Sequence, residues 1–318
     1  MDWADERFSR RRFLRLAAGI GAAQMAGPGV LRALGGDGAP YPSGIHTRAI
    51  PSTGVRIPAI GMGTYITFNV GPSKRLRDAR AEVLRQFFRL GGGMIDSSPM
   101  YGSSEAVVGH CLKRVEGDAR LFSATKVWNR DPEKGRKQIA DSHRLWGVDS
   151  FDLLQVHNLV NWRAHLPILR ERKERGEVRH IGVTTSHGRR HPELESVLRN
   201  EPLDFVQLTY NIRNRAAEER LIPLAKERGV AVIANRPYQR GRLMDRYQTE
   251  ALPDWAPEAG IRNWAEFFLK YIIALPGVTC AIPATSQVAH MRENMGAMRG
   301  KLPAGADRRR MAEYIARL

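Results

Sequence analysis

Cysteine is nearly absent from the sequence, and its scarcity excludes two kinds of small protein. The 318 residues include only Cys111 and Cys280, each within an apolar run. Two cysteines are too few for a disulfide framework or a cysteine-bound metal cluster, and no cysteine or histidine spacing typical of zinc occurs. We therefore expect both thiols to be buried as small hydrophobic groups, and we expect no metal site.

Carboxylates are scarce relative to basic residues. The chain has 33 Asp and Glu against 50 Lys and Arg, which gives a formal charge of +17. A basic excess can indicate nucleic-acid binding, but here Arg and Lys are spread through the predicted helices rather than gathered with aromatic residues into a stripe. Because 42% of the residues are apolar, a globular protein with a solvated basic surface is favoured. We expect no nucleic-acid partner.

The sequence also lacks the glycine-rich turn of an open nucleotide-binding sheet. Gly61 and Gly63 form a G-x-G, but no third glycine follows and no helix begins at the required spacing. A dinucleotide-binding fingerprint needs that glycine between its first strand and first helix. An open doubly wound sheet is therefore the weaker α/β alternative.

The amino terminus carries the pattern of an export signal. The basic segment Ser9-Arg10-Arg11-Arg12-Phe13-Leu14-Arg15 precedes an apolar run, 16–27, that is too short to span a bilayer. This pattern predicts a twin-arginine signal, the twin-arginine export machinery as a partner, and a periplasmic or otherwise exported protein. A frayed terminus is the alternative, and an uncleaved tether stays open because no clean cleavage site is present. We assign residues 1–42 to the signal and linker.

Short apolar runs alternate with helical patterns through the remaining residues, 43–318. The segment 47–58 predicts an amino-terminal β-hairpin, and 59–63 is the first strand of the series. Further strands are expected at 94–96, 121–126, 151–157, 179–183, 205–208, 231–234 and 279–282. Helices are expected at 78–90, 105–112, 133–145, 163–175, 193–199, 216–228, 261–274 and 288–297. Eight such units predict a (β/α)8 TIM barrel. The segment 239–260 reads as a long loop, and 307–317 as a terminal helix.

Polar side chains stand where three successive strands end. Asp96 ends the strand at 94–96, Lys126 the next, and His157 the third, while Tyr101 follows Asp96 in the motif D-S-S-P-M-Y-G-S-S-E. The carboxyl ends of barrel strands meet on one face, so these four side chains are expected to converge. We expect the ammonium of Lys126 to lower the pKa of the Tyr101 phenol and Asp96 to hold that ammonium. Each residue alone also suits a capping, packing or solvated role.

The contexts of these four residues, D-S-S-P-M-Y-G-S-S-E, A-T-K-V-W and L-L-Q-V-H-N, resemble the aldo-keto reductases. The resemblance runs from about Thr47 to Asn294. It implies a catalytic tetrad of Asp96, Tyr101, Lys126 and His157. It also implies reduction of an aldehyde or ketone by hydride from a nicotinamide, with Tyr101 as general acid and His157 orienting the carbonyl.

The resemblance further implies positions for the cofactor, NADPH by family default with NADH possible. Thr184 and Thr185 stand where the family shows Ser-Asn, and Gln207 fits Q-x-x-Y-N. Asn235 replaces the usual stacking aromatic, so either Tyr238 substitutes for it or Tyr238 is a packing residue. Relatives often carry Lys or Arg where Ala284, Ser286 and His290 stand, so weak discrimination against NADH is expected. The expected cofactor residues are Gly63, Thr64, Asp96, Thr184, Thr185, Gln207, Asn235, Arg236, Pro237, Tyr238, Ile282, Ala284, Thr285, Glu293 and Asn294.

The expected substrate pocket takes Tyr65, Trp128 and Asn158, and its aromatic walls favour an apolar carbonyl compound, although core packing also explains Trp128. We expect a monomer. Two alternatives remain. One is a barrel enzyme that forms a Schiff base on Lys126, which a neighbouring Asp96 disfavours. The other is an exported nicotinamide-binding redox sensor or docking protein with little turnover.

Overall fold

The computed structural model describes residues 41–115 and 120–318, all within the unit Asp37–Leu318. The predicted export signal, residues 1–42, therefore lies outside the described residues except for its last two. In the described part, no helix combines the length and the apolar character that crossing a membrane requires.

Eight parallel strands form the centre of the fold, in the order in which they occur along the chain. They are β3 (Met62–Gly63), β4 (Met94–Asp96), β5 (Phe122–Val127), β6 (Phe151–Val156), β7 (Val178–Thr184), β8 (Phe205–Thr209), β9 (Ala231–Asn235) and β10 (Cys280–Ala281). Parallel bridges from Ile60 to Ala281 and from Gly63 to Ala284 connect the last strand to the first. The predicted (β/α)8 barrel is therefore confirmed.

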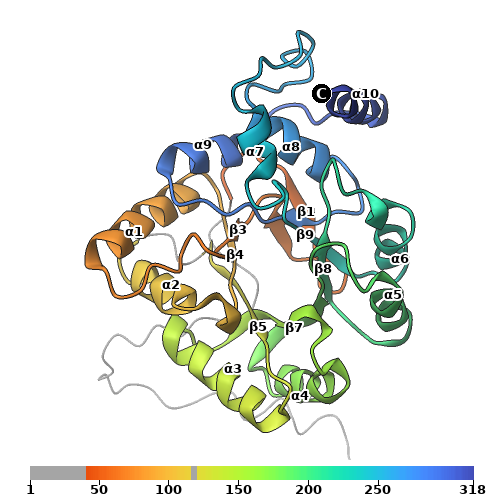
Figure 1. Ribbon diagram of the computed structural model, residues 1–318. Coiled ribbons are helices and arrows are strands. Elements are labelled where there is room, and N and C mark those ends of the chain that lie inside the picture. Colours follow the sequence, from red (N-terminus) through yellow and green to blue (C-terminus); the bar gives the residue numbers. More distant parts are fainter. Residues whose placement is uncertain (1–40, 116–119) are drawn as a thin grey trace, which may run out of the picture. The chain divides into compact units, whose positions relative to one another are not determined.

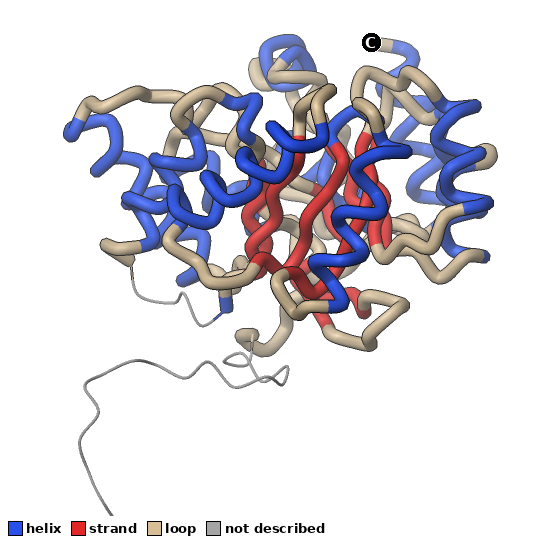
Figure 2. The backbone as a smooth tube through the Cα atoms, turned by 90° about the horizontal axis from the view of Figure 1, so that it is seen from below, coloured by secondary structure: helices blue, strands red, loops and turns tan. Residues whose placement is uncertain are grey.

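Helices surround the strands, as Figure 1 shows along the barrel and Figure 2 shows from the side. The helices are α1 (Lys74–Arg89), α2 (Ser104–Leu112), α3 (Pro132–Trp146), α4 (Trp162–Glu174), α5 (His191–Asn200), α6 (Leu221–Glu227), α7 (Arg242–Tyr247), α8 (Trp264–Ile273), α9 (Val288–Gly296) and α10 (Gly305–Arg317). Local chemistry fixes their ends. In α3, for example, the Asp131 carboxylate accepts from the amides of Glu133 and Lys134, and Gly147 ends the helix with a left-handed φ of 71°.

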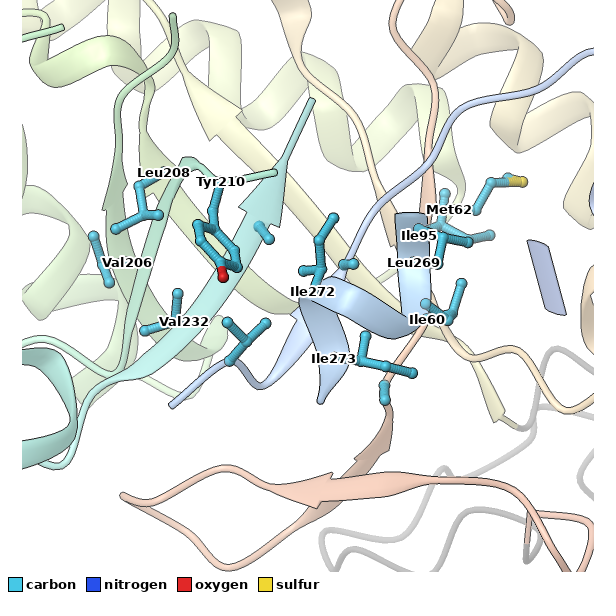
Figure 3. Packing of buried hydrophobic residues seen from close by; sticks show 14 of the residues in the cluster. Ile60, Met62, Ile95, Val206, Leu208, Tyr210, Val232, Leu269, Ile272 and Ile273 are labelled. Atoms are coloured by element: carbon cyan, nitrogen blue, oxygen red, sulfur yellow. The ribbon is translucent and has the colours of Figure 1, made fainter. Parts of the chain in front are cut away.

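Two apolar layers fill the structure. The larger lies between the strands and the helices, and Figure 3 shows part of it, with Leu269 and Ile272 of α8 in the same cluster as the strand residues Ile95 and Val232. Every residue of α8 is buried, including Lys270, whose ammonium donates to three backbone carbonyls. The smaller layer fills the barrel interior.

The predicted hairpin closes the amino-terminal end of the barrel. Strands β1 (Thr47–Ala49) and β2 (Arg56–Pro58) pair in antiparallel register. Ile50 and Ile57 belong to the same buried cluster as Met94 and Phe122, which begin β4 and β5. The opposite, carboxyl-terminal face is consequently the one where polar strand ends gather.

Two segments differ from the sequence-based expectation. The expected loop at 239–260 contains the short helix α7, because Gly241 supplies a left-handed start and Leu243 and Tyr247, one turn apart, are both buried. The expected helix at 216–228 is divided into a 3-10 turn, Ala216–Glu218, and α6, because Arg220 leaves the helical region at φ −137°.

Candidate active site

Three adjacent strands bring the four predicted catalytic residues together. Asp96 ends β4, Lys126 is near the end of β5, and His157 directly follows β6. Tyr101 lies in the 3-10 turn Pro99–Tyr101 after β4. The Tyr101 ring lies 5.7 Å from the His157 ring and 5.3 Å from the Lys126 ammonium, measured to its centroid. The expected convergence at one barrel face is thus observed.

Lys126 and Asp96 form a buried ion pair. The Lys126 Nζ lies 2.6 Å from Asp96 Oδ2, and the two side chains are 0% and 2% exposed. The ammonium also donates to the Ser97 carbonyl at 2.8 Å, while Asp96 Oδ1 accepts from Gln207 at 2.9 Å and Gln155 at 3.3 Å. Burial lowers the pKa of Lys126, and the Asp96 carboxylate opposes that shift. The ion pair with Asp96 therefore keeps the Lys126 amine charged, which counts against a Schiff-base role.

The environment of Tyr101 differs from expectation. Its pKa is raised well above the usual value, first by burial and then by the Asp96 carboxylate, whereas the Arg236 guanidinium acts to lower it. We expected Lys126 to lower this pKa. Its charge is compensated by direct contact with Asp96, and its contact with Tyr101 is to the ring. Tyr101 consequently holds its proton at neutral pH.

His157 is held as a neutral imidazole. Burial and the Lys126 charge lower its pKa well below the usual value. Its Nδ1 lies 2.8 Å from the Ser98 hydroxyl oxygen, and Nε2 makes no hydrogen bond to any residue that the structure describes. When Nδ1 accepts from Ser98, Nε2 carries the hydrogen and is able to donate it.

Three supporting residues were missed in the sequence. Ser98 orients His157, Gln155 donates to Asp96, and Glu105 accepts hydrogen bonds from Thr125, Ser142 and Trp146 behind Lys126. Strand alternation places Gln155 and His157, two residues apart, toward the same side, so the spacing was a usable signal for Gln155. Ser98 and Glu105 both lie within the quoted motif.

The predicted nicotinamide positions lie in or directly after β7, β8 and β9. Asn235 donates to the Thr185 carbonyl at 2.9 Å and to the Gln207 amide oxygen at 3.4 Å, so these residues form one network with Asp96. Two polar atoms beside it, Thr185 Oγ1 and Asn158 Oδ1, are buried and have no hydrogen-bond partner among the described residues. Such atoms fit a ligand amide, which supplies both a donor and an acceptor.

The remaining predicted cofactor residues lie in or directly after β3, after β9 and β10 and, for Glu293 and Asn294, in α9. Gly63 and Thr64 are buried at the end of β3, and Gly63 N donates to the Pro283 carbonyl at 2.9 Å. Tyr238 is buried, and its hydroxyl donates to Asn294 at 2.6 Å, which favours the packing alternative over stacking on a cofactor. Arg236 and Pro237 directly follow β9, Ile282, Ala284 and Thr285 follow β10, and Glu293 lies in α9.

The predicted substrate residues line the rim. Tyr65 and Trp128 are 36% and 43% exposed, so core packing does not explain Trp128. Asn158 is half-buried and adopts a left-handed φ of 52°. Non-glycine residues with positive φ in the described ranges all follow the carboxyl ends of β3, β6, β7 or β9. Backbone strain of this kind concentrates at functional sites.

Other candidate sites are weaker. One surface hollow, of about 580 Å³, is lined by residues 251–258 and α10. A second, of about 490 Å³, lies between α5 and α6. Both lie away from the four predicted catalytic residues. Neither contains a buried charged pair. Among the residues that the structure describes, no group of side chains suits a metal ion.

A parallel barrel that gathers an acid, a phenol, an ammonium and an imidazole at its carboxyl-terminal face has the architecture of a barrel enzyme. Residues 59–306 match the model of the Aldo/keto reductase family, and the chain belongs to this family.

Known proteins resemble the chain over most of its length. Methylglyoxal reductase YeaE of Escherichia coli is 27% identical over 253 residues, covering 78% of this chain and 88% of that protein. The NADH-specific methylglyoxal reductase of the same organism is 27% identical over 256 residues, or 70% and 76% of the two chains. An aldo/keto reductase from Klebsiella pneumoniae, solved with NADP and acetate, superposes with a TM-score of 0.70 at 23% identity, covering 82% and 92%.

The buried neutral state of His157 predicts a pH dependence of stability. Because its folded pKa lies well below about 6.5, the unfolded chain binds a proton that the folded chain does not as the pH falls. The proton uptake of the unfolded chain therefore leaves the free energy of unfolding unchanged above about pH 6.5 and lowers it progressively below that pH. Between pH 7.5 and 5.5, the wild type should lose about 1 kcal/mol more than His157→Gln, measured by thermal unfolding. His290→Gln, at an exposed site, should keep the wild-type dependence. Equal losses in the wild type and His157→Gln would contradict this assignment.

Proposed function

We propose that the protein is an NAD(P)H-dependent carbonyl reductase that converts an aldehyde or ketone to an alcohol. The observation that carries the proposal is the convergence of Asp96, Tyr101, Lys126 and His157 at the carboxyl-terminal face, with the ion pair buried. Family membership supports it, as do the names of the Escherichia coli methylglyoxal reductases.

Each residue has a role that follows from its environment. The bound nicotinamide supplies the hydride that the carbonyl carbon accepts. Tyr101 holds its proton at neutral pH and transfers it to the carbonyl oxygen, and it acts as the base in the reverse direction. His157 donates from Nε2 to the same oxygen and orients it, while Ser98 fixes the imidazole. The ammonium of the Lys126–Asp96 pair lies over the Tyr101 ring, 5.3 Å from its centroid, and so holds the phenol in position.

The cofactor proposal rests on the amide network and on the ends of β9 and β10. Thr185 Oγ1 and Asn158 Oδ1 are the partnerless atoms that suit the nicotinamide amide. NADP(H) is proposed, with NAD(H) accepted, because one relative is named as NADH-specific and a related structure holds NADP. Ala284, Ser286 and His290 offer no guanidinium to a 2′-phosphate, so we propose weak discrimination.

The decisive assay uses the full chain with NADPH or NADH and a panel of aldehydes and ketones that includes methylglyoxal, following cofactor absorbance. Tyr101→Phe should lower kcat/KM by about a hundredfold or more, because the proton donor is removed. Tyr314→Phe, on α10, is the matched control and should keep the wild-type rate. The NADPH preference over NADH should be below about a hundredfold.

Three outcomes would contradict parts of this proposal. Unchanged turnover in Tyr101→Phe would remove Tyr101 from the chemistry. Tight cofactor binding without turnover in the wild type would favour a redox sensor. A larger preference for NADPH would mean that another residue pairs with the 2′-phosphate.

We also propose export through the twin-arginine route, on the pattern of residues 9–27 alone. Folding around the cofactor before export reconciles this route with a nicotinamide site. Cell fractionation should find the protein outside the cytoplasm, and replacing Arg11 and Arg12 together by Lys should retain it inside. Wild-type protein confined to the cytoplasm would overturn the proposal.

A further inference from the structure

Cationic side chains gather on the loops that follow β7 and β9. Arg236 is half-buried at the end of β9, and its guanidinium contacts the His187 imidazole. Arg240, four residues later, is exposed. The pKa of Arg236 is lowered mainly by burial and to a smaller extent by the nearby guanidinium of Arg240. Burial and the charges of Arg236, Arg189 and Arg240 likewise lower the pKa of His187. Like charges therefore converge at this point of the rim.

This cationic group is connected to the catalytic phenol through Tyr65. The Arg240 guanidinium donates to the Tyr65 hydroxyl at 3.0 Å and lies 5.1 Å from the centroid of its ring. The Tyr65 ring in turn lies 5.0 Å from the Tyr101 ring, edge to face. The positive charge thus stands one aromatic ring away from the proposed proton donor.

Neither guanidinium has a carboxylate partner within residues 41–115 and 120–318. Arg190, on the loop after β7, pairs with Glu193, and Arg262 pairs with Glu266. Arg236 and Arg240 instead contact an imidazole and a phenol, both uncharged partners. Asp96 is occupied by Lys126. Asp245, the nearest acid along the loop, forms no ion pair with either arginine.

The backbone holds both arginines in an unfavourable conformation. Arg236 and Arg240 have φ values of 54° and 63°, in the left-handed region that few side chains adopt. The Arg236 carbonyl accepts from the Asn211 side chain at 3.0 Å, which fixes the loop to the turn after β8. The structure around the loop therefore holds two cations, without a carboxylate partner among the described residues, at a strained position beside the site.

We propose that Arg236 and Arg240, with Tyr65, form an anion subsite that binds a carboxylate or phosphate group on the carbonyl substrate. The inference rests on the proposed reductase function and refines the expected apolar substrate. The apolar part of the substrate lies against Tyr65 and Trp128, and the anionic end of the substrate contacts the guanidinium groups of Arg236 and Arg240. Guanidinium is the side-chain group best suited to bind such oxyanions through paired hydrogen bonds.

Cofactor phosphates carry the same chemistry, and Arg236 is also one of the predicted cofactor residues, so the test must separate the two sources. We would compare 4-carboxybenzaldehyde with its neutral methyl ester, measuring kcat/KM and the dissociation constant of each aldehyde with the full chain. The dissociation constant of NADPH is measured in parallel. Comparing ratios between variants cancels the intrinsic difference in reactivity between the two aldehydes.

Arg240→Gln should lower the ratio of kcat/KM for 4-carboxybenzaldehyde to kcat/KM for its methyl ester about tenfold, and Arg240→Glu should lower this acid-to-ester ratio further. Arg240→Lys should retain part of the preference. Arg89→Gln is the matched control, because Arg89 is exposed in the last turn of α1, which leads to the amino end of β4. That variant should keep the wild-type ratio.

An unchanged ratio in Arg240→Gln overturns the subsite. The same result combined with weaker NADPH binding assigns the cations to the cofactor phosphates and also overturns it. If the wild type reduces neither aldehyde, the proposed reductase function fails separately. In that case the ratio of the two aldehyde dissociation constants tests the subsite instead, and an unchanged ratio in Arg240→Gln overturns it.

Discussion

The ion pair between Lys126 and Asp96 is the interaction on which the site depends. Burying both charges costs free energy that their mutual attraction repays only if the remaining hydrogen-bonding groups are satisfied. The Ser97 carbonyl, Gln155 and Gln207 provide those partners. These residues belong to or directly follow β4, β5, β6 and β8, and β7 lies between the last two, so the pair joins one side of the barrel at its carboxyl-terminal edge.

The neighbouring groups take their properties from this pair. Burial together with the Asp96 carboxylate keeps the Tyr101 phenol protonated, and burial together with the Lys126 ammonium keeps the His157 imidazole neutral. Since Gln207 contacts both Asp96 and Asn235, the same network reaches the predicted nicotinamide position. The cations of Arg236 and Arg240 stand outside it, and neither has a carboxylate partner in the part of the chain that the structure describes.

The sequence predicted most of the barrel because its signals are local. The strand at 94–96 ends where the apolar run meets Asp96, and α3 is bounded by Asp131 and Gly147. The strand ends also predicted the four converging side chains. The pKa of Tyr101 was predicted in the wrong direction, because burial and the compensation of Lys126 by Asp96 are properties of packing. Contacts such as Ser98 with His157 and Arg240 with Tyr65 join segments 59 and 175 residues apart, and no local pattern encodes them.

The most direct test of this account compares Asp96→Asn, Lys126→Met and the double variant in thermal unfolding and in NADPH-dependent reduction. Each single variant leaves one buried charge without its partner and should destabilise the fold by about 3–5 kcal/mol. The double variant should regain most of that stability, yet its kcat/KM should stay at least about a hundredfold below the wild type. A double variant that reduces its substrate at the wild-type rate would show that the pair serves folding alone, and it would contradict the central claim.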